Sequence, residues 1–196
     1  MPRTEQFFLE LGQTAKLVNF SSGYRINDFD CRENPYNDFL VEDALPLHNE
    51  CTSRTKLLIN KQNADVIGYT SLCTGSIVIN DEEKEQHDIE APFKSMPTLK
   101  IGMLAIDKEY KGEGYGSLLI YLCRGIAEEL LENGIACKFI DVDADLSIDG
   151  NEEFYKKNGF LENKVLNRSS SKTLSMRLDF LNYEEHFDEV LPASVR

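Results

Sequence analysis

The sequence lacks the features that mark disulfide-stabilised, zinc-binding and membrane-spanning proteins. It has five cysteines, an odd number, with no CxxC pair and no Cys/His cluster. This pattern predicts reduced thiols and neither a disulfide framework nor a zinc site. No run approaches the ~18 apolar residues of a transmembrane helix, and the N-terminal MPRTEQFFLELGQ mixes charge with apolar residues too early for a secretory signal. We therefore expect a soluble, cytoplasmic protein without a membrane partner.

Basic residues are scarce relative to acidic ones. The chain has 21 Lys and Arg against 34 Asp and Glu, a formal net charge of −13. A charge of this sign favours solubility and repels the phosphate backbone of nucleic acids. On composition alone we do not expect a nucleic-acid partner, and a cationic small molecule or a basic peptide terminus fits better.

The chain has no internal repeat and no low-complexity linker, and 41% of its residues are apolar. This content predicts a single domain over 1–196, with a core over about 16–180 and a tail over 183–196. The run DEEKEQHDIE holds six acids and one Lys, which predicts a solvated acidic loop within 80–97. Surface positions are expected for the three histidines, His48, His87 and His186.

Hydrophobic periodicity predicts an α/β fold. The stretch LKIGMLAI over 99–106 is apolar on both faces, as in a central strand that is covered on two sides. Residues 117–133 carry one apolar stripe at steps of three and four, and Gly134 is placed to end that helix. The other expected elements are strands over 16–20, 55–60, 65–79, 135–144 and 173–180, and helices over about 36–49 and 151–158.

The stretch DVDADLSIDGNE, residues 141–152, has almost the acid spacing of an EF-hand calcium loop. Position 6 of such a loop must turn sharply and uses glycine, but here it is Leu146, and the preceding residues favour a strand. We therefore expect no metal. The stretch is instead predicted to be the end of a strand, a short loop and the start of a helix.

A glycine-rich loop, KGEGYG over 111–116, lies between the predicted central strand and the long helix. Glycine there allows successive N–H groups to point into one concavity at a helix N-terminus, a geometry that binds phosphate. The loop is neither a P-loop, which needs GxxxxGK[ST], nor a dinucleotide fingerprint, which needs GxGxxG.

Two blocks, LKIGMLAIDKEYKGEGYGSLLI and the later NEEFYKKNGF, resemble the GNAT superfamily of acetyl-CoA-dependent N-acetyltransferases. The resemblance implies the GNAT acyl-CoA N-acyltransferase fold, a mixed and mostly antiparallel central sheet flanked by helices, and acetyl-CoA as cofactor. Lys111 stands where the family has Gln or Arg. The cofactor-binding residues that the resemblance implies are Leu104, Ala105, Ile106, Lys111, Gly112, Glu113, Gly114, Tyr115, Gly116, Ser117 and Asn151.

The resemblance also implies catalytic roles. Tyr155 is the expected acid, because a tyrosine of pKa about 10 is protonated at neutral pH and can supply the proton that the leaving thiolate takes up. The expected general base is Asp143, which shares one face of a predicted strand with Asp141 and Asp145. A solvated acidic face that attracts a cationic substrate is an alternative interpretation of these carboxylates.

The expected reaction is acetyl transfer to a primary amine of a small molecule or peptide by direct attack. The segment FDCRENPYNDFLVEDA is also similar to a GNAT branch that includes toxins acting on aminoacyl-tRNA, but the net charge of −13 argues against that substrate. A CoA-binding sensor without catalysis is the remaining alternative. The last strands and the tail, 183–196, are a candidate contact with a second subunit in a homodimer.

Overall fold

The computed structural model describes residues 5–165 and 172–182. The tail over 183–196, which is one part of the expected homodimer contact, lies outside the described residues. The backbone divides into two compact units that interleave in sequence. Unit 1 comprises Met1–Cys73 and Ile101–Cys123, and unit 2 comprises Thr74–Lys100 and Arg124–Arg196. The expectation of a single domain stays a prediction.

Seven strands form one sheet in the order β1-β2-β3-β4-β5-β7-β6. Their bounds are β1 Ala15–Asn19, β2 Arg54–Asn60, β3 Val66–Val78, β4 Ser95–Ile106, β5 Phe139–Asp145, β6 Leu161–Glu162 and β7 Thr173–Leu178. The pairs β1–β2, β2–β3, β5–β7 and β6–β7 are antiparallel. The predicted α/β fold with a mostly antiparallel sheet is therefore confirmed, and β4, the strand with two apolar faces, is the middle one.

The helices are α1 Glu5–Thr14, α2 Asn34–Asp38, α3 Ala44–Asn49, α4 Asp81–Gln86, α5 Tyr115–Glu132 and α6 Asn151–Lys157, with 3₁₀ turns η1 Ile26–Asp28 and η3 Lys108–Tyr110. A π-helical turn, η2 Phe39–Asp43, joins α2 to α3, so the helix predicted over 36–49 is present. The stop of α5 is also as predicted, since Gly134 has φ 77° and its amide bonds Leu131 O. None of the helices within the described residues is long and apolar enough to span a bilayer.

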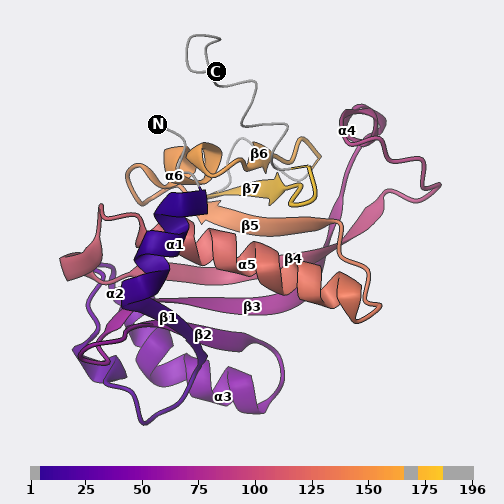
Figure 1. The fold of residues 1–196 in the computed structure, drawn as a ribbon. Coiled ribbons are helices and arrows are strands. Elements are labelled where there is room, and N and C mark those ends of the chain that lie inside the picture. The colour runs from indigo at the N-terminus through magenta and orange to yellow at the C-terminus, as the bar shows by residue number, and fades with distance from the viewer. Residues whose placement is uncertain (1–4, 166–171, 183–196) are drawn as a thin grey trace. The chain divides into compact units, whose positions relative to one another are not determined.

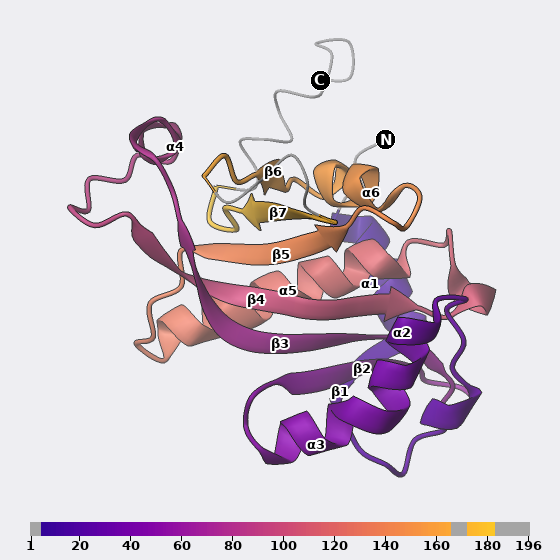
Figure 2. The ribbon, with the colours of Figure 1, turned by 180° about the vertical axis from the view of Figure 1, so that it is seen from behind.

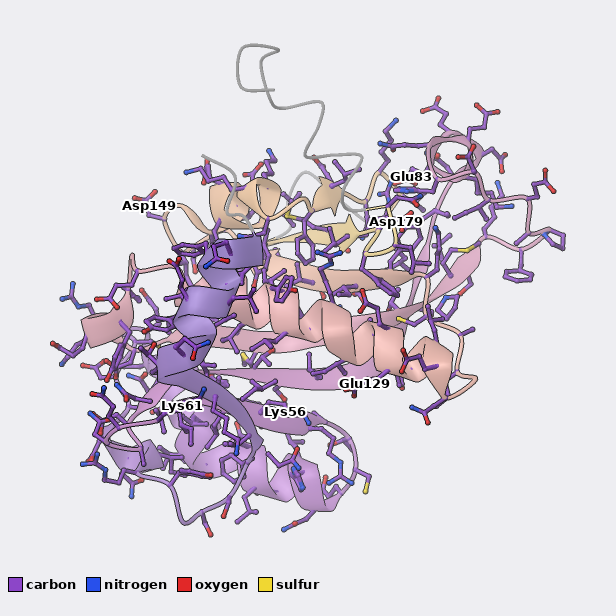
Figure 3. The ribbon with its side chains drawn as sticks, in the orientation of Figure 1. Lys56, Lys61, Glu83, Glu129, Asp149 and Asp179 are labelled. Atoms are coloured by element: carbon purple, nitrogen blue, oxygen red, sulfur yellow. The ribbon has the colours of Figure 1, made fainter. Side chains whose placement is uncertain are left out.

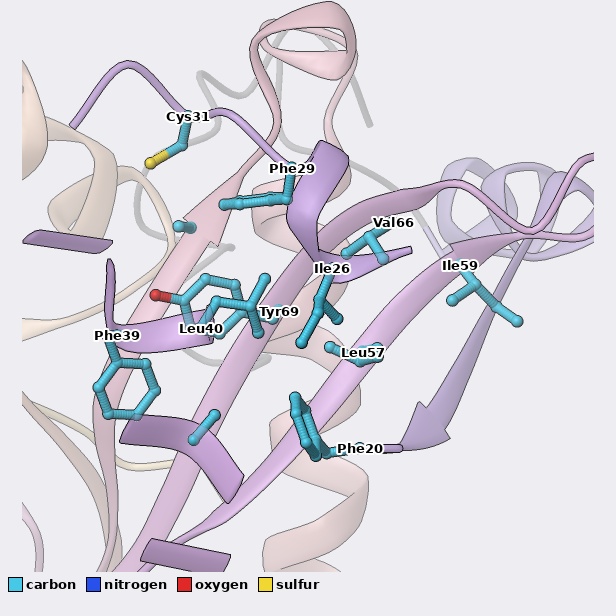
Figure 4. Close-up of a cluster of buried hydrophobic side chains, with 12 residues drawn as sticks. Phe20, Ile26, Phe29, Cys31, Phe39, Leu40, Leu57, Ile59, Val66 and Tyr69 are labelled. Atoms are coloured by element: carbon cyan, nitrogen blue, oxygen red, sulfur yellow. The ribbon is translucent and has the colours of Figure 1, made fainter. Parts of the chain in front are cut away.

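In unit 1, α1 and the start of α5 cover one face of the strands and the α2–η2–α3 segment covers the other (Figures 1 and 2), and apolar side chains are buried under both. One cluster lies under the α2–η2–α3 segment and centres on Tyr69, whose ring contacts Phe29 and Phe39 (Figure 4). The other lies under α1 and the start of α5, where the Phe8 and Tyr121 rings stack at 4.7 Å. These two layers hold the end of β4 and the start of α5 in place.

The predicted acidic loop is wrong in part, because its first half is the helix α4. Asn80 and Glu83 form a capping box: the Glu83 amide donates to the Asn80 side chain at 2.8 Å, and the Asn80 amide donates to Glu83 at 2.9 Å. The Glu83 side chain is fully buried, and its other oxygen accepts from Arg177 on β7 at 2.7 Å. A buried carboxylate needs such a partner. Arg177 lies 94 positions later in the chain, so the local sequence around Glu83 does not predict this ion pair.

A buried polar network in unit 2 surrounds this ion pair, and Figure 3 labels two of its members, Glu83 and Asp179. Arg177 Nε donates to His87 Nε2 at 3.1 Å, so the other ring nitrogen of His87 donates to Asp179 at 3.0 Å. The expected surface position of His87 is therefore wrong. Burial alone would raise the pKa of Asp179, but hydrogen bonds from His87 and Lys138 outweigh it and lower that pKa.

We expect Glu83→Gln to lower the free energy of unfolding by roughly 3 kcal/mol, because it leaves the buried Arg177 guanidinium without its counter-charge. Glu82→Gln is the matched control, since Glu82 pairs with Lys164 in an exposed position and should contribute less than about 1 kcal/mol. Urea unfolding of the two variants measures the difference. Equal effects would show that the buried pair does not stabilise unit 2.

Candidate active site

The connection from β4 to α5 has the backbone of an anion-binding turn. Gly112 and Gly114 have φ values of 86° and 105°, which residues with a side chain rarely adopt. The first hydrogen bond of the α5 ladder runs from the Leu118 amide to Gly114 O at 3.0 Å. The ladder does not use the preceding amides of Tyr115 and Gly116, which lie at the positive end of the helix dipole. This backbone fits a pyrophosphate.

Packing on unit 1 holds the start of α5 rigidly. Tyr115 is buried, its hydroxyl lies 3.3 Å from Thr14 Oγ1, and its ring meets the Tyr110 ring edge to face. Tyr115, which the family resemblance implies is a cofactor-binding residue, is thus packed within unit 1, and its contact with the cofactor stays a prediction. Ser117 in the first turn of α5 is buried as well.

Lys111, the residue in the family's Gln/Arg position, is used within the protein. Its ammonium donates to the carbonyl oxygen of Cys31 at 2.6 Å. The side chain thus ties the start of the glycine loop to the segment before α2. Recognition of a phosphate at this loop consequently depends on backbone groups and on the helix terminus rather than on this ammonium alone.

The end of β4 presents alternate backbone groups to its two edges. The Asp107 amide donates to Ile67 O on β3 at 2.9 Å, and Ala105 O lies against Gly68 of the same strand. Backbone groups alternate along a strand, so those of Leu104 and Ile106 point to the opposite edge of β4. Gly68 is required here, because a Cβ at that position would lie 2.7 Å from Ala105 O.

In unit 2, helix α6 carries two of the predicted site residues. Tyr155 is 4% exposed, and its ring packs edge to face against Phe154 and Phe160 at 5.0 and 5.3 Å. The Asn151 amide side chain donates to the carbonyl of Asp145 at 3.1 Å. Asn151 thereby ties the start of α6 to the end of β5.

Lys100 is a residue of this region that the sequence did not indicate. Its ammonium on β4 bonds Asp141 and Asp143 on β5, each at 2.9 Å. Both carboxylates therefore share one face of the strand, as predicted. Burial alone would lower the pKa of Lys100, but hydrogen bonds to Asp143 and Asp141 outweigh it and raise that pKa. Lys100 is thus a cation at neutral pH and not an amine nucleophile.

The calcium-like stretch divides as predicted into β5, a turn and α6. In the turn, Asp145 accepts hydrogen bonds from the amide and hydroxyl of Ser147 at 2.9 and 2.6 Å. Asp145 Oδ1 thus stabilises the turn through these two hydrogen bonds. Within residues 5–165 and 172–182 no three His, Cys, Asp or Glu side chains gather as metal ligands do.

Comparison with known proteins identifies the family. The sequence model of the acetyltransferase (GNAT) family matches residues 24–160, more than half of the chain. The chain belongs to the acetyltransferase (GNAT) family. Members use acetyl-CoA, so the chain is an acetyl-CoA-dependent acetyltransferase.

Solved structures show the same fold. AtaT complexed with acetyl-methionyl-tRNAfMet is 23% identical with a TM-score of 0.71, over 88% of this chain and 99% of that one. AtaTR bound with AcCoA is 23% identical with a TM-score of 0.67, over 89% and 99%. A tyrosine-to-phenylalanine mutant of KacT is 23% identical with a TM-score of 0.69, over 89% and 100%. A chain complexed with tRNA therefore shares this fold.

The left-handed glycines allow a direct test of the loop. Gly114→Ala should cost about 1–3 kcal/mol of stability, because φ 105° is strained for alanine, and should weaken acetyl-CoA binding measured by calorimetry. Gly125→Ala is the control within α5: its Cβ would meet nothing within 4 Å, so it should stabilise by about 0.5–1 kcal/mol and leave binding unchanged. If Gly114→Ala bound acetyl-CoA like the parent protein, the loop would not be the phosphate site.

Proposed function

We propose that this protein transfers the acetyl group of acetyl-CoA to a primary amine by direct attack. The observation that carries the proposal is the turn between β4 and α5, where two left-handed glycines lead into a helix N-terminus on a rigid support. The turn would hold the pyrophosphate through the amides around Gly114 to Gly116. Acetyl-CoA supplies an activated acyl group, and the chain supplies positioning and proton transfer.

The opposite edge of β4 is the proposed place for the pantetheine arm. Backbone groups of Leu104 and Ile106 point to that edge, so they are the groups that would pair with the arm or polarise the thioester carbonyl. Ala105 presents its carbonyl toward Gly68 of β3 instead. Of the three strand residues implied by the family resemblance, the geometry therefore supports Leu104 and Ile106.

Tyr155 is the proposed acid. Its ring packs edge to face against Phe154 on α6 and Phe160 after the helix, which limits where its hydroxyl can point. A clamped phenol is suited to deliver a proton at one fixed position, because little rotamer freedom remains to be lost in the reaction.

Tyr155→Phe is expected to reduce kcat by about 10²-fold or more while leaving the Kd for acetyl-CoA within about twofold, since only the proton donor is removed. Phe154→Leu serves as the control for packing. It should lower the free energy of unfolding and change kcat and the Kd for acetyl-CoA much less than Tyr155→Phe changes kcat. A Tyr155→Phe enzyme with the parent kcat would exclude Tyr155 as the acid.

Asp143 is the proposed proton acceptor that converts the bound ammonium of the substrate into the neutral amine that attacks. It is half exposed, so an amine can approach it, whereas Asp141 is buried. The Lys100 ammonium lies 2.9 Å from both Asp143 and Asp141, so the group of three side chains carries one negative charge. That charge would attract a cationic amine to Asp143, from which the amine's proton would pass to solvent.

We expect Asp143→Asn to raise the KM for the amine by about tenfold, with a smaller change in kcat, because the main loss is attraction of a cation. Steady-state kinetics at saturating acetyl-CoA separates the two parameters. Asp149→Asn, in the turn before α6, is the control for the loss of one negative charge. A change confined to kcat would instead assign Asp143 to the chemical step.

A second candidate acceptor is the α-amine of an aminoacyl-tRNA. The specific observation that favours it is the fold shared over most of both chains with AtaT, which has been solved with acetyl-methionyl-tRNAfMet. The acid excess is also uneven, with 9 basic and 13 acidic residues in unit 1 against 12 and 21 in unit 2. Unit 1, which holds the glycine loop, repels a phosphate backbone less than the net charge implies.

The deciding experiment supplies ¹⁴C-acetyl-CoA with either a panel of polyamines and peptides or a pool of charged tRNA. Label on the amine panel supports the first acceptor class, and label in the tRNA fraction that is lost on deacylation supports the second. Calorimetry with acetyl-CoA runs in parallel. Binding without any labelled product in either arm would mean a CoA-binding sensor, and absence of binding would overturn the proposal itself.

A further inference from the structure

We infer that Asp30 is a positioning residue for the cofactor loop, acting through an anchor that joins the segment before α2 to the residues before Gly112. The anchor consists of the contacts that Asp30 and Cys31 make with Asp107, Lys108 and Lys111. All of these residues belong to unit 1. The inference deepens the proposed function, because it concerns the same acetyl-CoA site.

Asp30 uses its backbone and its side chain to hold the loop after β4. Its amide donates to Asp107 Oδ2 at 2.8 Å, and its carbonyl accepts from the Lys108 amide at 2.8 Å. Its carboxylate accepts from the Lys108 ammonium at 2.9 Å. Three hydrogen bonds between residues 77 and 78 positions apart in sequence therefore converge on one residue.

The same carboxylate shapes its own segment. Asp30 Oδ1 accepts from the Arg32 amide at 2.8 Å and from the Asn37 side chain at 3.2 Å. Asn37 in turn accepts from the Cys31 amide at 3.0 Å. Arg32 has φ 70°, a strained value that these contacts stabilise. The turn that Asp30 organises leads directly into α2.

The second end of the anchor adjoins the glycines. Lys111, the residue before Gly112, donates to Cys31 O at 2.6 Å. Asp107 at the other end accepts from the Glu109 amide at 2.9 Å. Residues 107–111 are consequently held at both ends by the segment over 30–31.

The first glycine of the loop lies at the surface, where it is exposed to solvent. A Cβ added at Gly112 would meet no atom within 4 Å, so the side of the backbone where a side chain would stand is open. A loop that is loose before binding must be ordered by the ligand, and that ordering reduces affinity. The anchor orders residues 107–111 in advance and so fixes where the two glycines begin.

The anchor residues have no chemical role of their own. Hydrogen bonds from Lys108, the Arg32 amide and Asn37 lower the pKa of Asp30 to about 2, so its carboxylate is too weak a base to take a proton at neutral pH. Burial raises the pKa of the Cys31 thiol, which disfavours a nucleophilic thiolate. Position, not proton transfer, is what these side chains supply.

The test measures acetyl-CoA binding by calorimetry and turnover by steady-state kinetics with the full chain. Asp30→Asn and Lys111→Met should each weaken the Kd and raise the KM for acetyl-CoA about tenfold, with kcat at saturating acetyl-CoA within about twofold. Lys111→Arg should restore most of the affinity, because it keeps a cationic donor for Cys31 O. Asp28→Asn, two residues earlier and exposed, is the control and should change nothing.

Hydrogen exchange of the cofactor-free chain gives a readout that needs no activity. Amides over 112–118 should exchange faster in Asp30→Asn, while those of β2 should not change. If Asp30→Asn does not fold, Lys108→Met removes the ion pair alone and takes its place. If these variants bound acetyl-CoA and exchanged their amides like the parent protein, the inference would be overturned. If the parent protein itself failed to bind acetyl-CoA, the proposed function would be overturned. The exchange result would then decide on the anchor by itself.

Discussion

The backbone path between β4 and α5 is the constraint on which the rest of the candidate site depends. Two glycines there have φ values of 86° and 105°, which strain a residue with a side chain. This path lets α5 begin directly after the turn, so that its first amides stay outside the helix ladder at the positive end of the dipole. The Lys111 contact before the turn and the packing of Tyr115 after it act on its two ends.

The parts of the fold that were predictable from the sequence are those that local patterns determine. The helix stop at Gly134 and the break at Gly159 follow from left-handed backbone, with φ 77° and 84°, which only glycine adopts without strain. The central position of β4 follows from its two apolar faces. The strand, turn and helix within 141–152 follow from Leu146 at a position where a calcium loop uses glycine.

The parts that were missed depend on partners far away in sequence. Glu83 is buried because Arg177, 94 positions later, supplies its counter-charge, and Lys100 gains its role from two aspartates more than 40 positions later. Composition made the α4 segment look like a solvated loop. One local signal was available there, since Asn80 and Glu83 have the three-residue spacing of a capping box, which predicts a helix start even within an acidic run.

Net charge is a weak guide to the acceptor, and the reason is the range of electrostatic interactions. At physiological ionic strength, exposed charges act over about 8 Å, so an amine or a phosphate near the site responds to its neighbours and not to the sum of −13. Some carboxylates are also buried in internal ion pairs, Glu83 with Arg177 and Asp179 with Lys138, and are not available to a ligand at the surface. We propose that the acceptor responds instead to the local face beside Lys100, where one cation is shared by two carboxylates and a single negative charge remains.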